Sequence, residues 1–148
     1  MSGIAWPAAL DNVSLLELIE TQAIGWLRAD ARMTELVSGR VYTVIPDDVV
    51  YPFVIIEGFV SSPWNRLRGF GRSVSFQARA QSQVRGDYEV HRIADRIVSV
   101  IDARDVPLPP AKRSLWSIDE TPGATYTDVD AGVLTYHRPV GVRVRVAV

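Results

Sequence analysis

The first part of the chain has the three- and four-residue hydrophobic spacing of amphipathic helices. Ser14 and Glu17 have the spacing of a capping box, in which each side chain satisfies a free backbone N–H. A helix is therefore predicted to begin there and to end near Asp30, with an apolar stripe formed by Leu15, Leu16, Ile19, Ala23, Trp26 and Leu27. Asp30 is placed to cap a short second helix, which Gly39 would end and whose apolar residues are Met33, Leu36 and Val37.

From Val41 the pattern changes to that of β-strands. Residues 40–46 and 51–60 are rich in β-branched and aromatic side chains, with the turn-like sequence DDVV between them. Four consecutive apolar residues at 53–56 predict cover on both faces of the second strand. Residues 73–83 alternate instead, as a half-buried strand does, with Val74, Phe76, Ala78 and Ala80 opposite Ser75, Gln77, Arg79 and Gln81.

A second long helix is predicted from Gly86 and Asp87 to Ile101. Its apolar face holds Val90, Ile93, Ala94, Ile97, Val98 and Ile101, and its polar face holds His91, Arg92, Asp95, Arg96, Ser99 and Asp102. The sequence VPLPP at 106–110 ends it and cannot continue as a helix or as a central strand. Residues 113–120 and 133–148 are predicted as further strands, and Pro139 is a candidate break in the last one.

Two segments have the composition of connections. Residues 61–72 contain Pro63, Gly69 and Gly71 and indicate a long connection or a hairpin tip; residues 121–132 indicate a loop or a mobile hairpin tip. No internal repeat or domain linker is evident, and residues 1–12 are expected to form an N-terminal arm. The order of elements predicts one α+β domain over residues 1–148, with two main helices packed on one face of a mostly antiparallel β-sheet.

Composition and charge narrow the function only slightly. Hydrophobic residues make up 47% and charged residues 22%, and the net charge of −1 gives no bulk attraction to nucleic acid or to an anionic membrane. Without cysteine, the chain has no disulfide and no thiolate metal site. It also lacks a signal-peptide pattern and an apolar run of about 20 residues, which predicts a soluble protein with no membrane partner.

No motif indicates catalysis or a cofactor. His91 and His137 lie in different predicted elements, so a metal site or a Ser-His-Asp triad would depend on the fold to bring them together. The sequence RGFGRS at 68–73 lacks the lysine and the length of a phosphate-binding loop and precedes a strand. The acidic residues Asp47, Asp48, Asp119, Glu120, Asp128 and Asp130 have no spacing typical of acid–base catalysis or calcium binding. We therefore expect no enzyme, no cofactor and no metal.

The last strand raises the question of what lies opposite its valines. Valine occupies every second position from 140 to 148, so Arg143 and Arg145 share the other face, with Gln77, Arg79 and Gln81 beside them if the two strands are oriented alike. An ordinary solvated face is one interpretation. An interface is favoured because residues 53–56 need cover on both faces and no acidic strand is evident to neutralise the arginines within one chain.

The segment of Trp64, Arg66, Arg68, Phe70 and Arg72 interleaves aromatic and cationic side chains. This composition is typical of protein interface hot spots and also of surfaces that bind single-stranded nucleic acid. A protein interface is favoured, because the chain has no net positive charge and no nucleic-acid recognition motif.

The order of segments resembles a known family. The sequences GRVYTVIPDDVVYPFVIIEG, GRSVSFQARAQSQVRGDYEVHRIADRIVSVID and HRPVGVRVRV are similar to those of the small tail-completion and tail-terminator proteins of long-tailed bacteriophages and related tail-like particles. The most specific parts are RVY at 40–42 followed by YPFV at 51–54, and a strand ending near Ser82 that leads through Gly86 into a helix. The resemblance covers roughly residues 15–148 and departs from the family at Ala80 and Gln81, where an aromatic residue is usual.

The resemblance implies a structural subunit without catalytic residues or cofactor. It implies a hexameric ring at the head-proximal end of the tail tube in the virion, assembled in the host cytoplasm, which stops tube polymerisation and joins the tail to the head. The implied partners are copies of the chain itself, the tail tube protein and the head–tail connector protein, with DNA passing through the lumen without specific binding. Exposure and charge alternation predict the contact residues as Trp64, Arg66 and Arg68 in the first connection, Tyr126, Asp128 and Asp130 in the second, and Arg143 and Arg145 on the sheet.

Three alternatives remain open at this stage. A head-side connector or neck protein of the same particle can share the size and fold. A nucleic-acid-binding α+β domain would use the basic sheet face on phosphates, with affinity that falls steeply as salt rises. An enzyme would show a ligand-induced rise in melting temperature.

Overall fold

The helices follow the predicted hydrophobic spacing. The computed structural model describes residues 15–63, 71–108, 112–119, 123–130 and 132–147. In these ranges the helices are α2 (Leu15–Ala29), α3 (Ala31–Val37) and α4 (Tyr88–Ile101). The buried face of α4 is largely as predicted, except that Val100 is buried and Val98 is half-buried. Ser14, and with it the predicted capping box, lies outside the described residues. No helix in these ranges is both long enough and apolar enough to cross a membrane.

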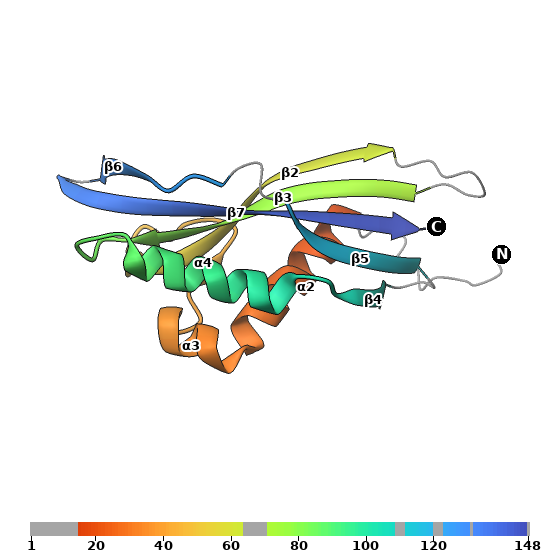
Figure 1. Ribbon diagram of the computed structural model, residues 1–148, viewed down its shortest axis with the longest axis horizontal. Coiled ribbons are helices and arrows are strands. Elements are labelled where there is room, and N and C mark those ends of the chain that lie inside the picture. The colour runs from red at the N-terminus through yellow and green to blue at the C-terminus, as the bar shows by residue number, and fades with distance from the viewer. Residues whose placement is uncertain (1–14, 64–70, 109–111, 120–122, 131, 148) are drawn as a thin grey trace.

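In the described part of the chain, seven strands form one sheet on one side of the helices (Figure 1). They are β1 (Val41–Tyr42), β2 (Phe53–Pro63), β3 (Gly71–Ser82), β4 (Asp105–Leu108), β5 (Lys112–Asp119), β6 (Tyr126–Asp130) and β7 (Val133–Ala147). Their order is β1-β2-β3-β7-β5-β4, and β6 pairs with β7. Among the described strands, only the β1–β2 pair is parallel, and the other pairs are antiparallel. The predicted single α+β domain, with helices packed on one face of a mostly antiparallel sheet, is confirmed.

The core lies between the helices and the alternating face of the central strands. Val140, Val142, Val144 and Val146 of β7 are buried, together with Val74, Phe76, Ala78 and Ala80 of the adjacent strand β3. Trp116 of β5 is fully buried between them and α2, with its ring centroid 4.6 Å from that of Trp26 in an edge-to-face arrangement. Its Nε1 donates to Ser114 Oγ at 3.0 Å, so the buried indole leaves no unpaired donor.

Several strand boundaries differ from the predicted ones. The strand expected at 40–46 is reduced to Val41 and Tyr42, because β1 runs parallel to β2 and residues 43–52 must carry the chain back to the start of β2. The strands β2 and β3 extend into the segment expected as a connection, through Pro63 and from Gly71; residues 64–70 lie outside the described residues. Pro107 lies in β4, an edge strand, in agreement with the expectation that VPLPP cannot form a central strand.

Strand β7 runs without a break through Pro139. On one side it pairs with β3 over residues 136–147. On the other side it pairs with β6 over 133–137 and with β5 over 141–147. Among the described strands, residues 138–140 therefore pair only with β3, so the missing N–H of proline falls where the second ladder is already interrupted. The candidate break predicted at Pro139 is wrong.

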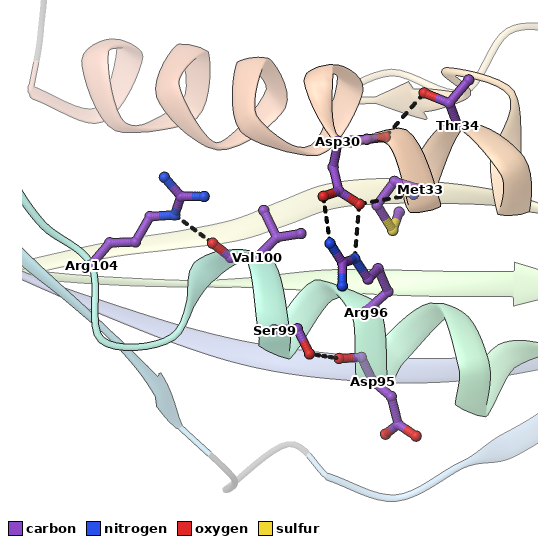
Figure 2. Close-up of polar contacts among 8 residues, drawn as sticks. All are labelled: Asp30, Met33, Thr34, Asp95, Arg96, Ser99, Val100 and Arg104. Atoms are coloured by element: carbon purple, nitrogen blue, oxygen red, sulfur yellow. Dashed lines mark hydrogen bonds and ion pairs between the residues drawn. The ribbon is translucent and has the colours of Figure 1, made fainter.

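Asp30 connects helices α3 and α4. Its Oδ2 accepts a hydrogen bond from Met33 N at 2.9 Å, which confirms the predicted cap of α3. Arg96 of α4 donates to both carboxylate oxygens, from Nε at 2.8 Å and from Nη2 at 2.7 Å (Figure 2). The hydrogen bonds from Arg96, with a smaller contribution from the Met33 N–H, lower the pKa of Asp30 from 3.8 to about 2, although partial burial acts in the opposite direction.

This arrangement predicts a pH-dependent part of the stability. Because the pKa of Asp30 is lower in the folded state, its contribution is complete above about pH 4 and is lost as the pH falls toward 2. At pH 7, Asp30→Ala should lower the free energy of unfolding by roughly 2–3 kcal/mol, since it removes both the cap and a charge-assisted pair. Asp30→Asn, which keeps a cap acceptor, should cost about half as much.

Urea unfolding of the wild-type protein and both variants between pH 7 and pH 2 measures these differences. The gap between wild type and Asp30→Asn should close with acidification. A gap that stays constant down to pH 2 would contradict the assignment to the Asp30 carboxylate.

Candidate functional site

The sheet face opposite the helices, called here the outer face, collects most of the predicted contact residues that the structure describes. The register places Val60, Ser75, Arg143 and Ser117 in one row across β2, β3, β7 and β5. A second row holds Phe53, Gln81, His137 and Tyr126, on β2, β3, β7 and β6. The prediction that Gln77, Arg79 and Gln81 share a face with Arg143 and Arg145 is confirmed by this register.

Arg143 and Arg145 lie on the half of β7 near its C-terminal end. Arg143 Nη2 is 3.2 Å from Asp119 Oδ2 of the neighbouring strand β5. The side chain of Arg143 nevertheless keeps 43% of its surface exposed, and Arg145 is also exposed. Two exposed aliphatic side chains lie in the same part of the outer face: Leu115 on β5 is directly opposite Arg145, and Val60 on β2 is in the row of Arg143, with Ser75 of β3 between them.

A polar network crosses the middle of the outer face. Arg79 Nη1 donates to Tyr126 Oη at 2.7 Å, and Arg79 Nε lies 3.2 Å from Glu57 Oε2. Gln77 Nε2 donates to the same Glu57 oxygen at 2.6 Å. The network therefore links β2, β3 and β6 with side chains alone, and it fixes the position of β6 relative to the centre of the sheet.

Tyr126 and Asp128 belong to strand β6, within the segment expected as a loop. The ring of Tyr126 stacks on His137, with centroids 4.8 Å apart and planes inclined by 5°. Asp128 Oδ1 lies 2.9 Å from Nε2 of the same histidine, which is buried. Residues 121–132 were predicted to be a loop or a mobile hairpin tip. Residues 126–130 instead form strand β6 of a hairpin with β7, because pairing with β7 and packing on His137 order a segment whose composition is that of a turn.

The structure separates the predicted contact residues into two groups. Tyr126 and Asp128 lie beside one end of β7, and the two arginines lie near the other end. His137 and Arg143 are six positions apart, so the groups are roughly 20 Å apart along the strand. Asp130 pairs with Val133 through its backbone. Trp64, Arg66 and Arg68 lie outside the described residues.

Two observations favoured an interface over a solvated face: the apolar residues 53–56 and the arginines without an evident acidic strand. Contacts within the chain explain both of them. Asp119 and Glu57 supply carboxylates to Arg143 and Arg79, so the expectation that no acidic strand neutralises the outer-face cations is wrong. Residues 53–56 are buried on both faces, as predicted. Phe53 contacts Tyr42 and Tyr51 of the same chain, with ring centroids 6.0 and 5.0 Å away. Sequence periodicity could not find these partners, since they come from other strands and from the connection 43–52.

The amino-acid sequence did not indicate that Glu57, Gln77, Arg79 and His137 take part in connected contacts. A weak signal exists in the sequence, because Glu57 ends an otherwise apolar segment and Arg79 interrupts the small apolar residues of the alternating strand. Only the register between β2 and β3, which pairs Glu57 with Gln77, brings the charges together.

The two histidines take part in separate contacts within the described residues. No group of three or more His, Asp or Glu side chains among them could hold a metal ion. His91 Nε2 lies 2.8 Å from Thr125 Oγ1, and His137 contacts Asp128. A groove of about 400 Å³ between α4 and the sheet is lined by Asp95, Val98, Ile118, Arg138 and neighbouring residues, and its described lining includes no serine, threonine or histidine.

Comparison with known proteins identifies relatives. The family model described as "Tail completion protein gp17" matches residues 22–147, most of the chain. Among solved structures, the fold is similar to a chain in "Virion of native gene transfer agent (GTA) particle", with a TM-score of 0.74 and 16% sequence identity. That match covers 93% of this chain and 100% of the other. No curated protein matches the sequence.

The polar network predicts unequal roles for two arginines on the sheet. Arg79→Ala should lower the free energy of unfolding by roughly 1–3 kcal/mol, because it leaves the partly buried Glu57 carboxylate without its cation and Tyr126 without its donor. The matched control is Arg113→Ala, which removes an exposed pair with Asp105 and should cost less than about 1 kcal/mol. Equal losses in urea unfolding would show that the network does not position β6.

Proposed function

The chain belongs to the family of tail completion protein gp17, and on this premise we propose that it caps the head-proximal end of the tail tube in a phage-like particle. The cap stops further addition of tube subunits and offers a surface to the head–tail connector. The family assignment supports a structural role in tail completion, and the capping function is a more specific proposal within that role.

The proposed mechanism is associative and steric. Copies of the chain form a closed ring, taken as a hexamer, and one side of the ring complements the last ring of tail tube protein. The other side does not offer the surface on which a tube subunit would add, so growth ends there. DNA passes through the lumen without specific binding. The protein is a virion component that is assembled in the host cytoplasm.

The observation that carries the proposal is the family match over residues 22–147. The surface is compatible with a role in association. Exposed aliphatic side chains occur on several strands among the described residues, including Val60, Leu115, Val129 and Leu134. Groups of such side chains at the edges and ends of a sheet are typical of interaction surfaces.

Deletion of the gene from the element that encodes the protein tests this function. Negative-stain electron microscopy of the products should show overlong or irregular headless tubes beside filled capsids. Complementation with the wild-type gene should restore tails of normal length and is the control for effects on neighbouring genes.

Two other outcomes would overturn the proposal in different ways. Unattached tails of normal length would move the protein to the head side of the neck, as a connector or head-completion subunit. Intact particles would rule out both roles.

A further inference from the structure

We propose that Gln81, His137 and Asp128 form a hydrogen-bonded relay across strands β3, β7 and β6, in which Gln81 is a positioning residue for β6. In this relay the side-chain amide of Gln81 donates to His137 Nδ1, and His137 Nε2–H donates to the carboxylate of Asp128. The relay fixes the tautomer of His137 and, through it, the direction of the Asp128 side chain.

Unpartnered buried nitrogen atoms gather in one part of the outer face. Among the described residues, three buried side-chain atoms have no hydrogen-bond partner: Arg79 Nε, Gln81 Nε2 and His137 Nδ1. Arg79 Nε lies 3.2 Å from Glu57 Oε2 and so keeps an ionic contact. Gln81 and His137 are only 4% and 5% exposed, so solvent does not satisfy the other two atoms. Buried polar atoms in folded proteins are nearly always paired, so these two atoms point to a contact with each other.

The register brings the two side chains together. Gln81 of β3 and His137 of β7 are directly paired across the antiparallel ladder, in the row that continues to Tyr126 of β6. Directly paired residues share a face of the sheet and have Cβ atoms about 5 Å apart, within reach of a hydrogen bond between an amide and an imidazole. A rotation of the glutamine side chain therefore closes the contact without movement of the backbone.

The contact on the other side of the imidazole decides which ring nitrogen can accept. His137 Nε2 lies 2.9 Å from Asp128 Oδ1, and an ionised carboxylate can only accept a hydrogen bond. The proton of the neutral ring is therefore assigned to Nε2, which leaves a lone pair on Nδ1. The unpartnered atom of Gln81 is an amide nitrogen and hence a donor, so the two unpartnered atoms are complementary.

The relay gives β6 a second connection to the centre of the sheet. Tyr126 already stacks on His137 and accepts a hydrogen bond from Arg79. The relay reaches Asp128, two residues further along β6, through the same histidine. The side chain of Asp128 is 58% exposed, so its carboxylate is held by His137 while it stays open to solvent. A carboxylate held in this way loses less side-chain entropy on pairing with a cation than a freely rotating one.

Long-range proton–nitrogen NMR spectra of the imidazoles test the relay, because they distinguish a protonated ring nitrogen, a hydrogen-bond acceptor and a free lone pair. The sequence contains two histidines, so His91→Gln assigns the signals. At about pH 8, above the range in which histidine is ordinarily charged, His137 should carry its proton on Nε2, and Nδ1 should give the signal of an acceptor. In Gln81→Leu the Nδ1 signal should move toward that of a free lone pair, while Nε2 stays protonated.

Hydrogen exchange measures the effect on β6. Gln81→Leu should raise the exchange rates of the backbone amides of residues 126–130 by roughly threefold to tenfold, the factor that corresponds to the loss of one hydrogen bond between buried groups.

The matched control is Gln83→Leu. Gln83 also reaches β7 with its side-chain amide, through a hydrogen bond of 3.3 Å from Nε2 to Thr135 Oγ1. This variant should leave the His137 Nδ1 signal unchanged and should affect the exchange of residues 126–130 less than Gln81→Leu does. Circular dichroism checks that each variant folds.

A second variant, Asp128→Ala, tests the relay from its exposed end and does not alter the buried pair. Gln81 still donates to Nδ1 in this variant, so the proton of His137 should stay on Nε2 although its acceptor is gone.

Three results would overturn the relay. They are a proton on His137 Nδ1 in the wild-type protein at this pH, an Nδ1 signal that Gln81→Leu leaves unchanged, and a transfer of the proton to Nδ1 in Asp128→Ala. A shifted Nδ1 signal with unchanged exchange of residues 126–130 would support the hydrogen bond and overturn the role of Gln81 as a positioning residue for β6.

Discussion

The two-residue period of strand β7 is the constraint on which the rest of the structure depends. This strand runs along the length of the sheet and pairs with β3 on one side and with β5 and β6 on the other. Its valines face the helices and are buried, so its arginines must face away from the core. A shift of one residue in register would bury Arg143 and Arg145 without partners, which makes the register strongly determined.

The outer face that results is neither apolar nor simply basic. Arg79 and Arg143 each contact a carboxylate from a neighbouring strand, and these pairs reduce the positive charge available to a phosphate backbone. This pairing weakens the case for a nucleic-acid surface and leaves mixed patches of cationic, anionic and aliphatic side chains. Such patches suit contacts between subunits, in which charge selects the partner and exposed aliphatic groups contribute apolar burial.

The polar contacts of the outer face are spread along the length of the sheet. The hairpin of β6 and β7 lies at one end, and the ends of β2, β3 and β5 lie at the other (Figure 1). Strand β7 therefore carries Arg143 and Arg145 toward one end and the pairing with β6 at the other.

The sequence alone determined the elements whose pattern is local. The apolar stripes of α2 and α4, the cap of α3 by Asp30, and the alternation of β3 and β7 follow from periods of 3.6 and 2 and from capping chemistry. The family resemblance also followed from the order of these segments. The tertiary structure alone decided the contacts between distant residues: Glu57 with Arg79, Asp119 with Arg143, Arg96 with Asp30, and the pairing that turns residues 126–130 into a strand. The reason is physical. A local pattern records which side of an element is buried, whereas the partner of a polar side chain depends on strand order and register, which are set only when the whole sheet forms.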